Sequence, residues 1–264
     1  MNEPLANRDA ERTTAVLRET AGRIAPARAT AVLVDQVLAG ATDSFFGVES
    51  PIGTVYVAAG PDGVRYLAPA ASEKEFARHY RERFGRFASS AVSVGPEDLA
   101  GRIAAALSGE RVEVPLDLSG ATPFQRRVLE TVKGITRGQV RPYVWVASEA
   151  GSPGASRAVG NVMANNPVPL LVPCHRVVRN DGRTGSYAFG AGEKVRLLRS
   201  EGVSPEEISG SPYVATPTTG IVCHTTCRNA KRIQPENRRV FRSVASAVEA
   251  GYRPCKVCRP VVAA

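Results

Sequence analysis

Apolar and polar residues alternate between residues 52 and 67, with the period of a half-buried β-strand. Pro61-Asp62-Gly63 interrupts this alternation with the residue types of a tight turn, so the pattern predicts a β-hairpin. Residues 72–85 and 96–109 then carry apolar side chains at helical spacing, and residues 111–118 alternate again. We therefore expect a small subdomain in which helices pack on a sheet.

The pattern becomes helical from Ala121 onwards. Residues 122–125 combine an N-cap threonine, an N1 proline and an N3 glutamine, which predicts the start of a helix. A short helix is expected over 143–151, and Ser152-Pro153 is expected to cap another over 153–166. Two short helices joined by a tight turn have the outline of a helix-turn-helix, although helical hairpins in ordinary cores share that outline.

These patterns predict an α+β fold with a small α/β N-terminal subdomain, a helical, winged helix-turn-helix-like domain and a small C-terminal domain. The boundaries expected are a helical or flexible extension over 1–45, the subdomain over 46–120 and the helical domain over 121–202. Residues 203–218 are rich in Ser, Pro and Thr without a period, so we expect a linker there. The last domain then occupies 219–264.

Composition places the chain among soluble globular proteins. Its 264 residues are 43% hydrophobic and 22% charged, which excludes a disordered or collagen-like chain. The sequence contains no run of about 18 apolar residues and no signal pattern at its start, so we expect a cytoplasmic protein without a membrane partner. Five cysteines are too few, and odd in number, for a secreted disulfide scaffold.

Charge is concentrated near the C-terminus. Residues 219–260 contain nine Lys or Arg and two Glu, which accounts for +7 of the net charge of +9. A short basic module attached to a nearly neutral body favours a polyanionic partner, and nucleic acid is the commonest one inside cells.

Cys174 stands apart from the other four cysteines, in the sequence PCHRVV. A lone buried cysteine is usually a small hydrophobic residue. Here His175 and Arg176 follow it and can supply the base and the positive field that a reactive thiolate needs. Neighbouring side chains in an extended segment point to opposite sides, so adjacency alone does not establish a catalytic pair.

The segment NNPVPLLVPCHRVVRNDGRTGSYAFGAGEKVRLLRSEG, with TPFQRRVLETVKGITRGQVRPY and SRAVG before it, resembles the O6-alkylguanine-DNA alkyltransferases over residues 46–202. The resemblance implies that Cys174 accepts the alkyl group from guanine O6. It also implies that His175 acts as the general base through a water, and that Glu201 orients the imidazole.

Further roles follow from the same resemblance. Asn166 matches the asparagine that organises the turn before the nucleophile, and Tyr143 the tyrosine that assists protonation of the departing guanine. Arg157 matches the arginine that fills the stack when the base is flipped out, and Ser156 and Ala158 lie beside it as further DNA-binding residues.

Tyr187 and Ala188 fall on the loop that encloses the flipped base in the family. Three positions depart from the family pattern. Pro142 replaces a small hydroxyl residue, Leu129 replaces a frequent tryptophan, and Phe189 stands where small residues are common. We expect Phe189 to narrow the pocket toward small alkyl groups.

The other four cysteines form two pairs. Three residues separate Cys223 from Cys227 and two separate Cys255 from Cys258, with 27 residues between the pairs. This spacing predicts a tetrahedral zinc site made by the four thiolates. Unlinked reduced cysteines and two disulfides are the alternatives, both disfavoured by the spacing and the cytoplasmic setting. His224 is expected not to be a ligand because four cysteines complete the site.

TTGIVCHTTCRNAKRIQPENRRVF and SAVEAGYRPCKVCRP also resemble the Ada-type zinc module, which takes methyl groups from phosphotriesters in DNA. Cys223 aligns with the methyl acceptor of that module. His224-Thr225-Thr226 replaces the usual Arg-Pro-Ser, so two roles remain open for this domain, a second methyl acceptor or a DNA clamp.

Together these observations predict a monomeric DNA-repair enzyme that acts once per molecule on double-stranded alkylated DNA. It is expected to need zinc but no organic cofactor, and to act on O6-alkylguanine, with O4-alkylthymine as a second candidate base. A non-catalytic sensor of alkylated bases and a Cys-His hydrolase are the alternatives. Transfer of a labelled methyl group from DNA to the protein separates all three.

Overall fold

The computed structural model describes residues 42–91 and 99–262. The predicted extension over 1–45 falls outside these residues except for its last four, which already belong to a strand. Within the described ranges, no helix is both long and apolar enough to cross a membrane. The chain divides into two compact units, the first ending at Ser119 and the second beginning at Gly120.

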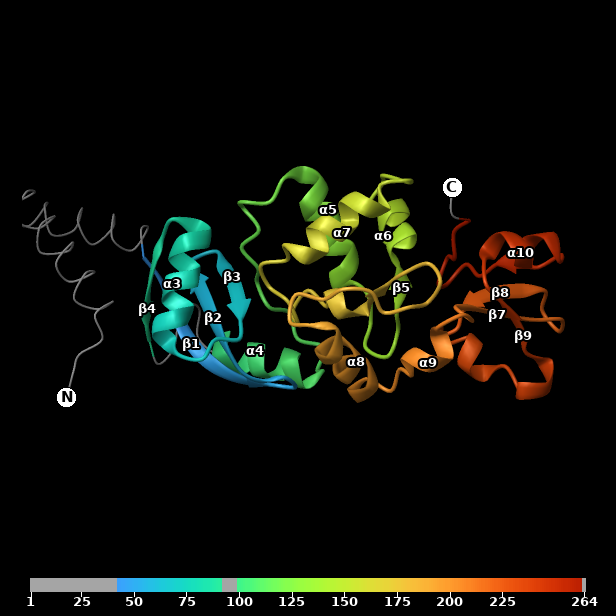
Figure 1. The fold of residues 1–264 in the computed structure, drawn as a ribbon, viewed down its shortest axis with the longest axis horizontal. Helices are drawn as coiled ribbons and strands as arrows, with labels where there is room; N and C mark the ends of the chain where they lie inside the picture. The colour runs from blue at the N-terminus through green and yellow to red at the C-terminus, as the bar shows by residue number, and fades with distance from the viewer. Residues whose placement is uncertain (1–41, 92–98, 263–264) are drawn as a thin grey trace, which may run out of the picture. The chain divides into compact units, whose positions relative to one another are not determined.

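The first unit is a four-stranded sheet covered by helices (Figure 1). Its elements are β1 (Thr42–Ser50), β2 (Gly53–Gly60), β3 (Gly63–Ala68), α3 (Glu73–Phe84), β4 (Phe87–Ser90) and α4 (Leu99–Ser108). The strand order is β3-β2-β1-β4, antiparallel except for the parallel pair of β1 and β4. Phe76 and Tyr80 of α3 are buried against Phe45, Ala58 and Ala68 of the sheet. The predicted hairpin and both predicted helices are confirmed.

The alternating segment 111–118 does not form the strand that its pattern favours. It makes a single bridge between Leu116 and Val64 of β3. The Val64 N–H donates to Pro115 O at 2.9 Å, and the Asp117 N–H donates to Val64 O at 2.8 Å. Pro115 has no N–H to donate, so the pairing with β3 does not extend before Leu116.

The second unit begins with the helical part. Its elements are α5 (Pro123–Lys133), β5 (Arg141–Pro142), α6 (Tyr143–Glu149), α7 (Ser156–Ala164), the 3₁₀ turn η1 (Cys174–Arg176), β6 (Val177–Val178), α8 (Ala191–Ser200) and α9 (Pro205–Ile208). The predicted cap of α5 is confirmed, since the Thr122 hydroxyl accepts from the Gln125 N–H and the Gln125 side chain accepts from the Thr122 N–H. The two residues of β5 pair in parallel with β6.

Helices α6 and α7 pack on each other and on α5, and a tight turn at Gly151 joins them. Helix α7 begins at Ser156, three residues later than predicted. Ser152 does not cap it, since the N-cap residue of α7 is Ala155. The Ser152 N–H instead donates back to Ala147 O at the end of α6. The helix-turn-helix outline is present with a longer turn.

The C-terminal part of the second unit is a second four-stranded sheet, shown in orange to red in Figure 1. Its elements are β7 (Tyr213–Thr216), β8 (Ile221–His224), η2 (Ala230–Arg232), η3 (Pro235–Asn237), β9 (Arg239–Phe241), α10 (Val244–Glu249) and β10 (Arg253–Pro254). The order is β10-β8-β7-β9. The segment predicted as an irregular linker, 203–218, therefore contains α9 and a fully buried central strand.

Candidate functional site

Cys174 is held at the start of η1 by a rigid turn. The Asn166 side chain spans this turn, since its Nδ2 donates to Val172 O at 2.9 Å and its Oδ1 accepts from the Val168 N–H at 3.1 Å. Leu170 has a φ of 71°, a left-handed conformation that costs a non-glycine residue about 1–3 kcal/mol. Asn166 and Cys174 are both buried. The turn therefore fixes the position of the Cys174 thiol.

His175 and Glu201 form a buried pair beside Cys174. His175 Nε2 lies 2.9 Å from Glu201 Oε1, although the two residues are 26 positions apart in the sequence. Arg176 binds the same carboxylate through its Nε and Nη2. Burial alone would raise the pKa of Glu201, but the hydrogen bonds from His175 and Arg176 lower it to about 2. Glu201 is therefore an anion at neutral pH.

This pairing assigns the hydrogen on the imidazole. A carboxylate only accepts hydrogen bonds, so Nε2 of His175 carries the hydrogen and Nδ1 keeps a free lone pair. Burial lowers the pKa of His175, which favours the neutral ring. His175 Nδ1 has no hydrogen-bond partner among the described residues. The ring is thus arranged as a base that has yet to receive a proton.

Burial raises the pKa of the Cys174 thiol, while the side chain of Asn166 and the charge of Lys194 lower it in part. Lys194 is fully buried on α8, and its Nζ donates to Val177 O at 2.6 Å. Burial lowers the pKa of Lys194 to about 8. The sequence analysis missed this residue, although a lysine that shares the buried face of α8 with Leu197 is a recognisable signal.

Two tyrosines lie near the thiol. Tyr143, the first residue of α6, and Tyr187 both have pKa values raised by burial and then by the charge of Cys174. The Tyr187 ring is T-shaped to His175 at 6.4 Å and to Phe189 at 5.4 Å. Its hydroxyl is buried without a partner among the described residues. The structure thus brings together six of the predicted residues, namely Cys174, His175, Asn166, Glu201, Tyr143 and Tyr187, and places Phe189 beside them.

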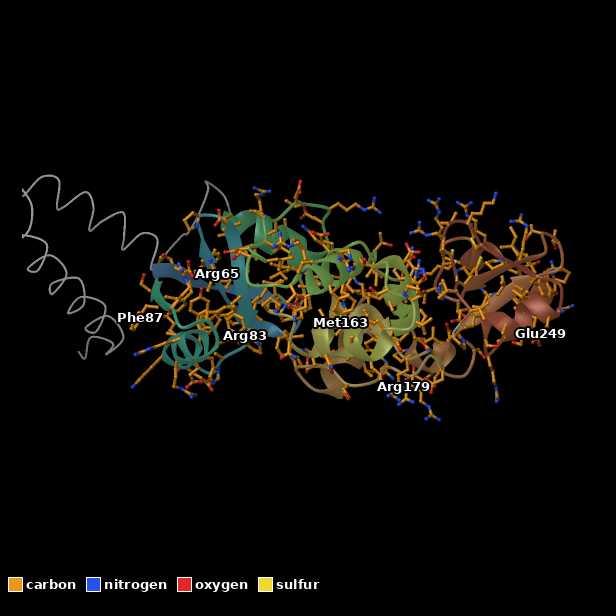
Figure 2. The ribbon with its side chains drawn as sticks, turned by 90° about the horizontal axis from the view of Figure 1, so that it is seen from above. Arg65, Arg83, Phe87, Met163, Arg179 and Glu249 are labelled. Carbon is orange, nitrogen blue, oxygen red and sulfur yellow. The ribbon has the colours of Figure 1, made fainter. Side chains whose placement is uncertain are left out.

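Arg157 lies on the exposed face of α7. Neither a hydrogen bond nor an ion pair joins it to any of the described residues, so its guanidinium is free. Ala158 beside it is exposed and Ser156 is half-buried. On the opposite face, Val159 and Met163, the latter labelled in Figure 2, are buried in the core.

A basic turn follows β6. The Arg179 N–H donates to Arg183 O at 2.9 Å, and both arginine side chains are exposed. Asp181 lies near both guanidinium groups, at 3.7 and 3.8 Å. Figure 2 labels Arg179 on the second unit.

The four remaining cysteines form one cluster. The Sγ atoms of Cys223, Cys227, Cys255 and Cys258 all lie within 4.8 Å of one another, and no disulfide links them. All four side chains are buried. Backbone N–H groups of His224 and Val257 approach Cys258 and Cys255 Sγ at 3.4 Å, which favours thiolates there.

This donor set fits zinc. Hydrogen bonds among the thiols raise the pKa of Cys223 and lower that of Cys227, so the four sulfurs do not ionise together without a cation. Four convergent sulfurs in a closed, buried site are the donor set of a structural zinc ion. His224 is buried with its ring 5.2 Å from that of Tyr213, and it lies outside the ligand group.

A pocket of about 420 Å³ opens on the cluster. Of the four cysteines, Cys223 alone lines it. Its walls are mainly hydroxyl, amide and guanidinium side chains, namely Thr216, Thr218, Thr219, Asn229, Arg232, Gln234 and Asn237. Such groups suit an oxygen-rich ligand like a DNA backbone phosphate.

Two family models match consecutive segments of the chain. Residues 123–203 match the 6-O-methylguanine DNA methyltransferase, DNA binding domain, and residues 204–261 match the metal binding domain of Ada. The second match begins nine residues before β7, so it includes all but the first residue of the segment predicted as a linker. The two resemblances found in the sequence are confirmed.

Several relatives share the same name. The methylated-DNA–protein-cysteine methyltransferase of Methanothermobacter thermautotrophicus is 48% identical over 91 residues, 34% of this chain and 51% of the relative. That of Methanosarcina acetivorans is 33% identical over 159 residues, 58% of this chain and 95% of the relative. The chain thus spans about half the length of the first relative and nearly all of the second.

The crystal structure of Mycobacterium tuberculosis OGT in complex with DNA is similar in fold. It has a TM-score of 0.50 and 28% identity, and the match covers 63% of this chain and 98% of that one. The α+β fold expected from the sequence is confirmed by this likeness. Together with the relatives, it shows that the chain belongs to the family of methylated-DNA–protein-cysteine methyltransferases.

Proposed function

We propose that this protein repairs DNA by transferring an alkyl group from O6 of guanine to Cys174, once per molecule. The observation that carries the proposal is the buried His175–Glu201 pair. His175 directly follows Cys174 in the sequence, and its Nδ1 has a free lone pair that can accept a proton. The relatives named as methylated-DNA–protein-cysteine methyltransferases support the same reaction.

The proton of the thiol has a defined destination. Because burial keeps Cys174 protonated, the thiol must lose its proton as it attacks. His175 Nδ1 takes this proton through a bridging water, and the anionic Glu201 stabilises the imidazolium that forms. Asn166 and Lys194 stabilise the developing thiolate.

The alkyl transfer forms one bond and breaks another. Cys174 Sγ bonds to the alkyl carbon while the carbon–O6 bond breaks, and the electron pair of that bond stays on guanine. Tyr143 assists protonation of the departing base. The protein keeps a thioether, which none of the described residues is placed to cleave, so each Cys174 reacts once.

The target base has to leave the duplex before it reaches a buried thiol. Base extrusion costs a few kcal/mol, which a side chain inserted into the gap offsets in part. The free, exposed guanidinium of Arg157 on the second helix of the helix-turn-helix supports this role. Tyr187 and Ala188 then enclose the flipped base, with O4-alkylthymine as a second candidate for the same pocket.

We further propose that the C-terminal domain holds one zinc ion in Cys223, Cys227, Cys255 and Cys258, and that Cys223 takes a methyl group from a phosphotriester. A zinc ion bound by these residues would keep the four sulfurs as thiolates. In the transfer, Cys223 Sγ bonds to the methyl carbon, the carbon–oxygen bond breaks, and the phosphate leaves as an anionic diester. The pocket lined by Cys223 supports this choice among the four sulfurs.

In this proposal residues 46–120 form the α/β subdomain, residues 121–202 the alkyltransferase domain and residues 219–264 most of the zinc domain, with β7 added to it. Five free cysteines fit a reducing cytoplasm. Double-stranded alkylated DNA is the partner, and we expect the protein to act as a monomer.

The test uses the full chain and duplex DNA with a labelled methyl on O6 of guanine. Peptide mapping should place one label per protein on the Cys174 peptide. A sensor would bind the DNA without acquiring label, and a hydrolase would release the label into solution with repeated turnover. Either result would exclude the alkyl-transfer proposal.

A further inference from the structure

Within the second unit, the alkyltransferase part (residues 123–203) contacts the zinc-binding part (residues 204–261). The Val140 N–H donates to Thr226 Oγ1 at 3.0 Å, and the same hydroxyl donates to Val140 O at 3.4 Å. Thr226 directly precedes the ligand Cys227, and both residues of the contact are buried. One hydroxyl therefore satisfies both backbone groups of a residue 86 positions away.

Neighbouring residues extend this contact. The Arg259 guanidinium, which follows Cys258, binds Glu149 at the end of α6. The space left between His224 to Thr226 and the β5–β6 pair is about 10 Å³, at the lower limit for a single water. The surfaces are thus closely packed.

His224-Thr225-Thr226 is the segment that departs from the Arg-Pro-Ser of the Ada-type module. In this structure all three residues line the contact with the alkyltransferase part. Of the three, Thr226 makes the hydrogen bonds to the alkyltransferase part, while Thr225 bonds Ser211 and the His224 ring lies 5.2 Å from that of Tyr213, both within the zinc-binding part.

Arg141, next to Val140, is a buried cation that pairs with no carboxylate in the described part of the chain. Its Nη1 donates to Val140 O at 2.7 Å and its Nη2 to Gln139 Oε1 at 2.5 Å, and its Nε is unpaired among the described residues. The guanidinium lies 5.3 Å from the centre of the Trp145 ring. Burying an unpaired charge costs several kcal/mol, so a compensating negative charge is expected nearby.

The Arg141 guanidinium lies beside the cluster, because its Nη1 and the Thr226 hydroxyl both donate to Val140 O, and Thr226 directly precedes Cys227. The pKa of Arg141 is lowered by burial, and the charges of Cys258, Cys227 and Cys255 oppose this shift more strongly than Glu149 does. Four thiolates around one Zn²⁺ carry a net charge of −2, which in turn requires cations around the site.

We propose that Arg141 of the alkyltransferase part is the counter-cation of the zinc centre and that Thr226 fixes the centre against it. The proposal rests on the zinc ion assigned above. The positive charge of Arg141 and the negative charge of the zinc centre each offset the cost of burying the other. The zinc site is therefore complete only when both parts of the chain are in contact.

The contact lies close to the guanine site along the chain. Arg141 and Pro142 of β5 pair with Val177 and Val178 of β6, which directly follow the turn that begins at Cys174. Tyr143 follows β5. A change in the charge of the zinc centre therefore changes the electrostatic field at the β5–β6 pair, which adjoins both Cys174 and Tyr143.

Zinc affinity tests the counter-cation. Full-length wild type, Arg141→Met and a control, Arg196→Met, are loaded with zinc and titrated with a chromophoric chelator. Arg196 is an exposed arginine paired with Glu193, so its loss should leave the affinity unchanged. Loss of Arg141 should lower it 10–100-fold, the usual effect of removing a group that supports metal ligands. Arg141→Lys, which keeps the charge, should restore part of it.

Amide hydrogen exchange tests the docking without relying on Arg141 variants. The Val140 amide should be protected in zinc-loaded wild type, and it should lose protection when zinc is removed or in Thr226→Val, which keeps the side-chain volume. This measurement decides the proposal if Arg141→Met does not fold.

The outcomes separate the two levels of inference. Wild type that binds no zinc would refute the zinc centre itself. One bound zinc with equal affinity in folded Arg141→Met and wild type would refute only the counter-cation. A Val140 amide that exchanges freely in the zinc-loaded protein would refute the docking.

Discussion

Cys174 is a neutral thiol in the resting site, so its chemistry depends on neighbouring residues that remove the proton. Cys174→Ser should abolish methyl transfer from O6-methylguanine while DNA binding stays nearly unchanged, because the thiol makes no phosphate contact. The measurement is label transfer alongside a binding titration. Arg196→Met, an exposed change on α8, is the control and should retain full transfer from guanine. Stoichiometric transfer by Cys174→Ser would exclude this residue as the acceptor.

The His175–Glu201 pair predicts a pH dependence. His175 acts as a base only when neutral, and burial lowers its pKa below the usual 6.5, so the single-turnover rate should be constant near neutrality and fall only in acid below that value. Glu201→Gln removes the charge that stabilises the imidazolium. It should slow transfer by roughly 10²- to 10⁴-fold, the usual range for general acid–base groups.

Glu206→Gln provides the control for that measurement, because Glu206 is an exposed carboxylate on α9 that pairs with Arg199. Its rate and pH profile should match those of wild type. A Glu201→Gln rate within a factor of a few of wild type across pH 5–8 would show that the carboxylate does not assist the base.

Single residues of the site differ in how far the sequence revealed them. Cys174 and Asn166 stand in a local motif, and their hydrogen bonds run within that motif. The partner of His175 lies 26 residues away, so only the family resemblance pointed to Glu201. Lys194 and Arg141 escaped notice because charged residues are expected at the surface, and their burial depends on tertiary packing.

Among the elements, those with a long repeated pattern were predicted well. The β2–β3 hairpin and helices α3, α4 and α5 carry many periods of their pattern, and each formed as expected. Short strands were missed. The four residues of β7 contain too few repeats to show alternation, and their burial comes from the sheet that assembles around them.

Helix α7 presents the exposed Arg157 to DNA in the proposed function. Arg157→Ala should slow transfer from duplex DNA by about tenfold or more, because an unfilled gap leaves a few kcal/mol of extrusion cost without compensation. Transfer from free O6-methylguanine should change little, since nothing has to be opened. Single-turnover rates on both substrates measure the difference.

Arg199→Ala tests whether any exposed arginine has the same effect, because Arg199 is exposed on α8 and pairs with Glu206. It should leave the ratio of the two rates unchanged. Equal slowing of Arg157→Ala on duplex and free base would assign Arg157 a structural role in α7.

At the scale of the whole molecule, charge and folding both depend on the zinc centre. Residues 219–260 carry a formal charge of +7, and four thiolates with one Zn²⁺ lower it to +5. Methylation of one thiolate raises it again by one. Since the rest of the chain is nearly neutral, the zinc domain should supply most of the salt-dependent attraction to DNA.

The same domain has little apolar core. One of its two buried clusters includes all four cysteines, and the other is small and consists of Tyr213, Ala215, Val222, Val244 and Ala247. Structural zinc contributes about 10–16 kcal/mol of binding energy in small zinc modules. Cys255→Ala should therefore release zinc and unfold the C-terminal sheet, as measured by metal content and by hydrogen exchange in β7 and β8.

Methylation of Cys223, unlike the loss of Cys255, should leave both the bound zinc and the fold of the domain unchanged. After exposure of the wild type to DNA carrying methylphosphotriesters, the Cys223 peptide should gain the mass of one methylene group. Binding to DNA should tighten, and the slope of log K against log salt should steepen by up to about 0.9, the contribution of one added charge. Wild type exposed to DNA without methylphosphotriesters is the control, and its Cys223 peptide should gain no mass. If the wild type binds one zinc and Cys223 never gains a methyl group, the pocket beside it holds DNA without accepting methyl groups.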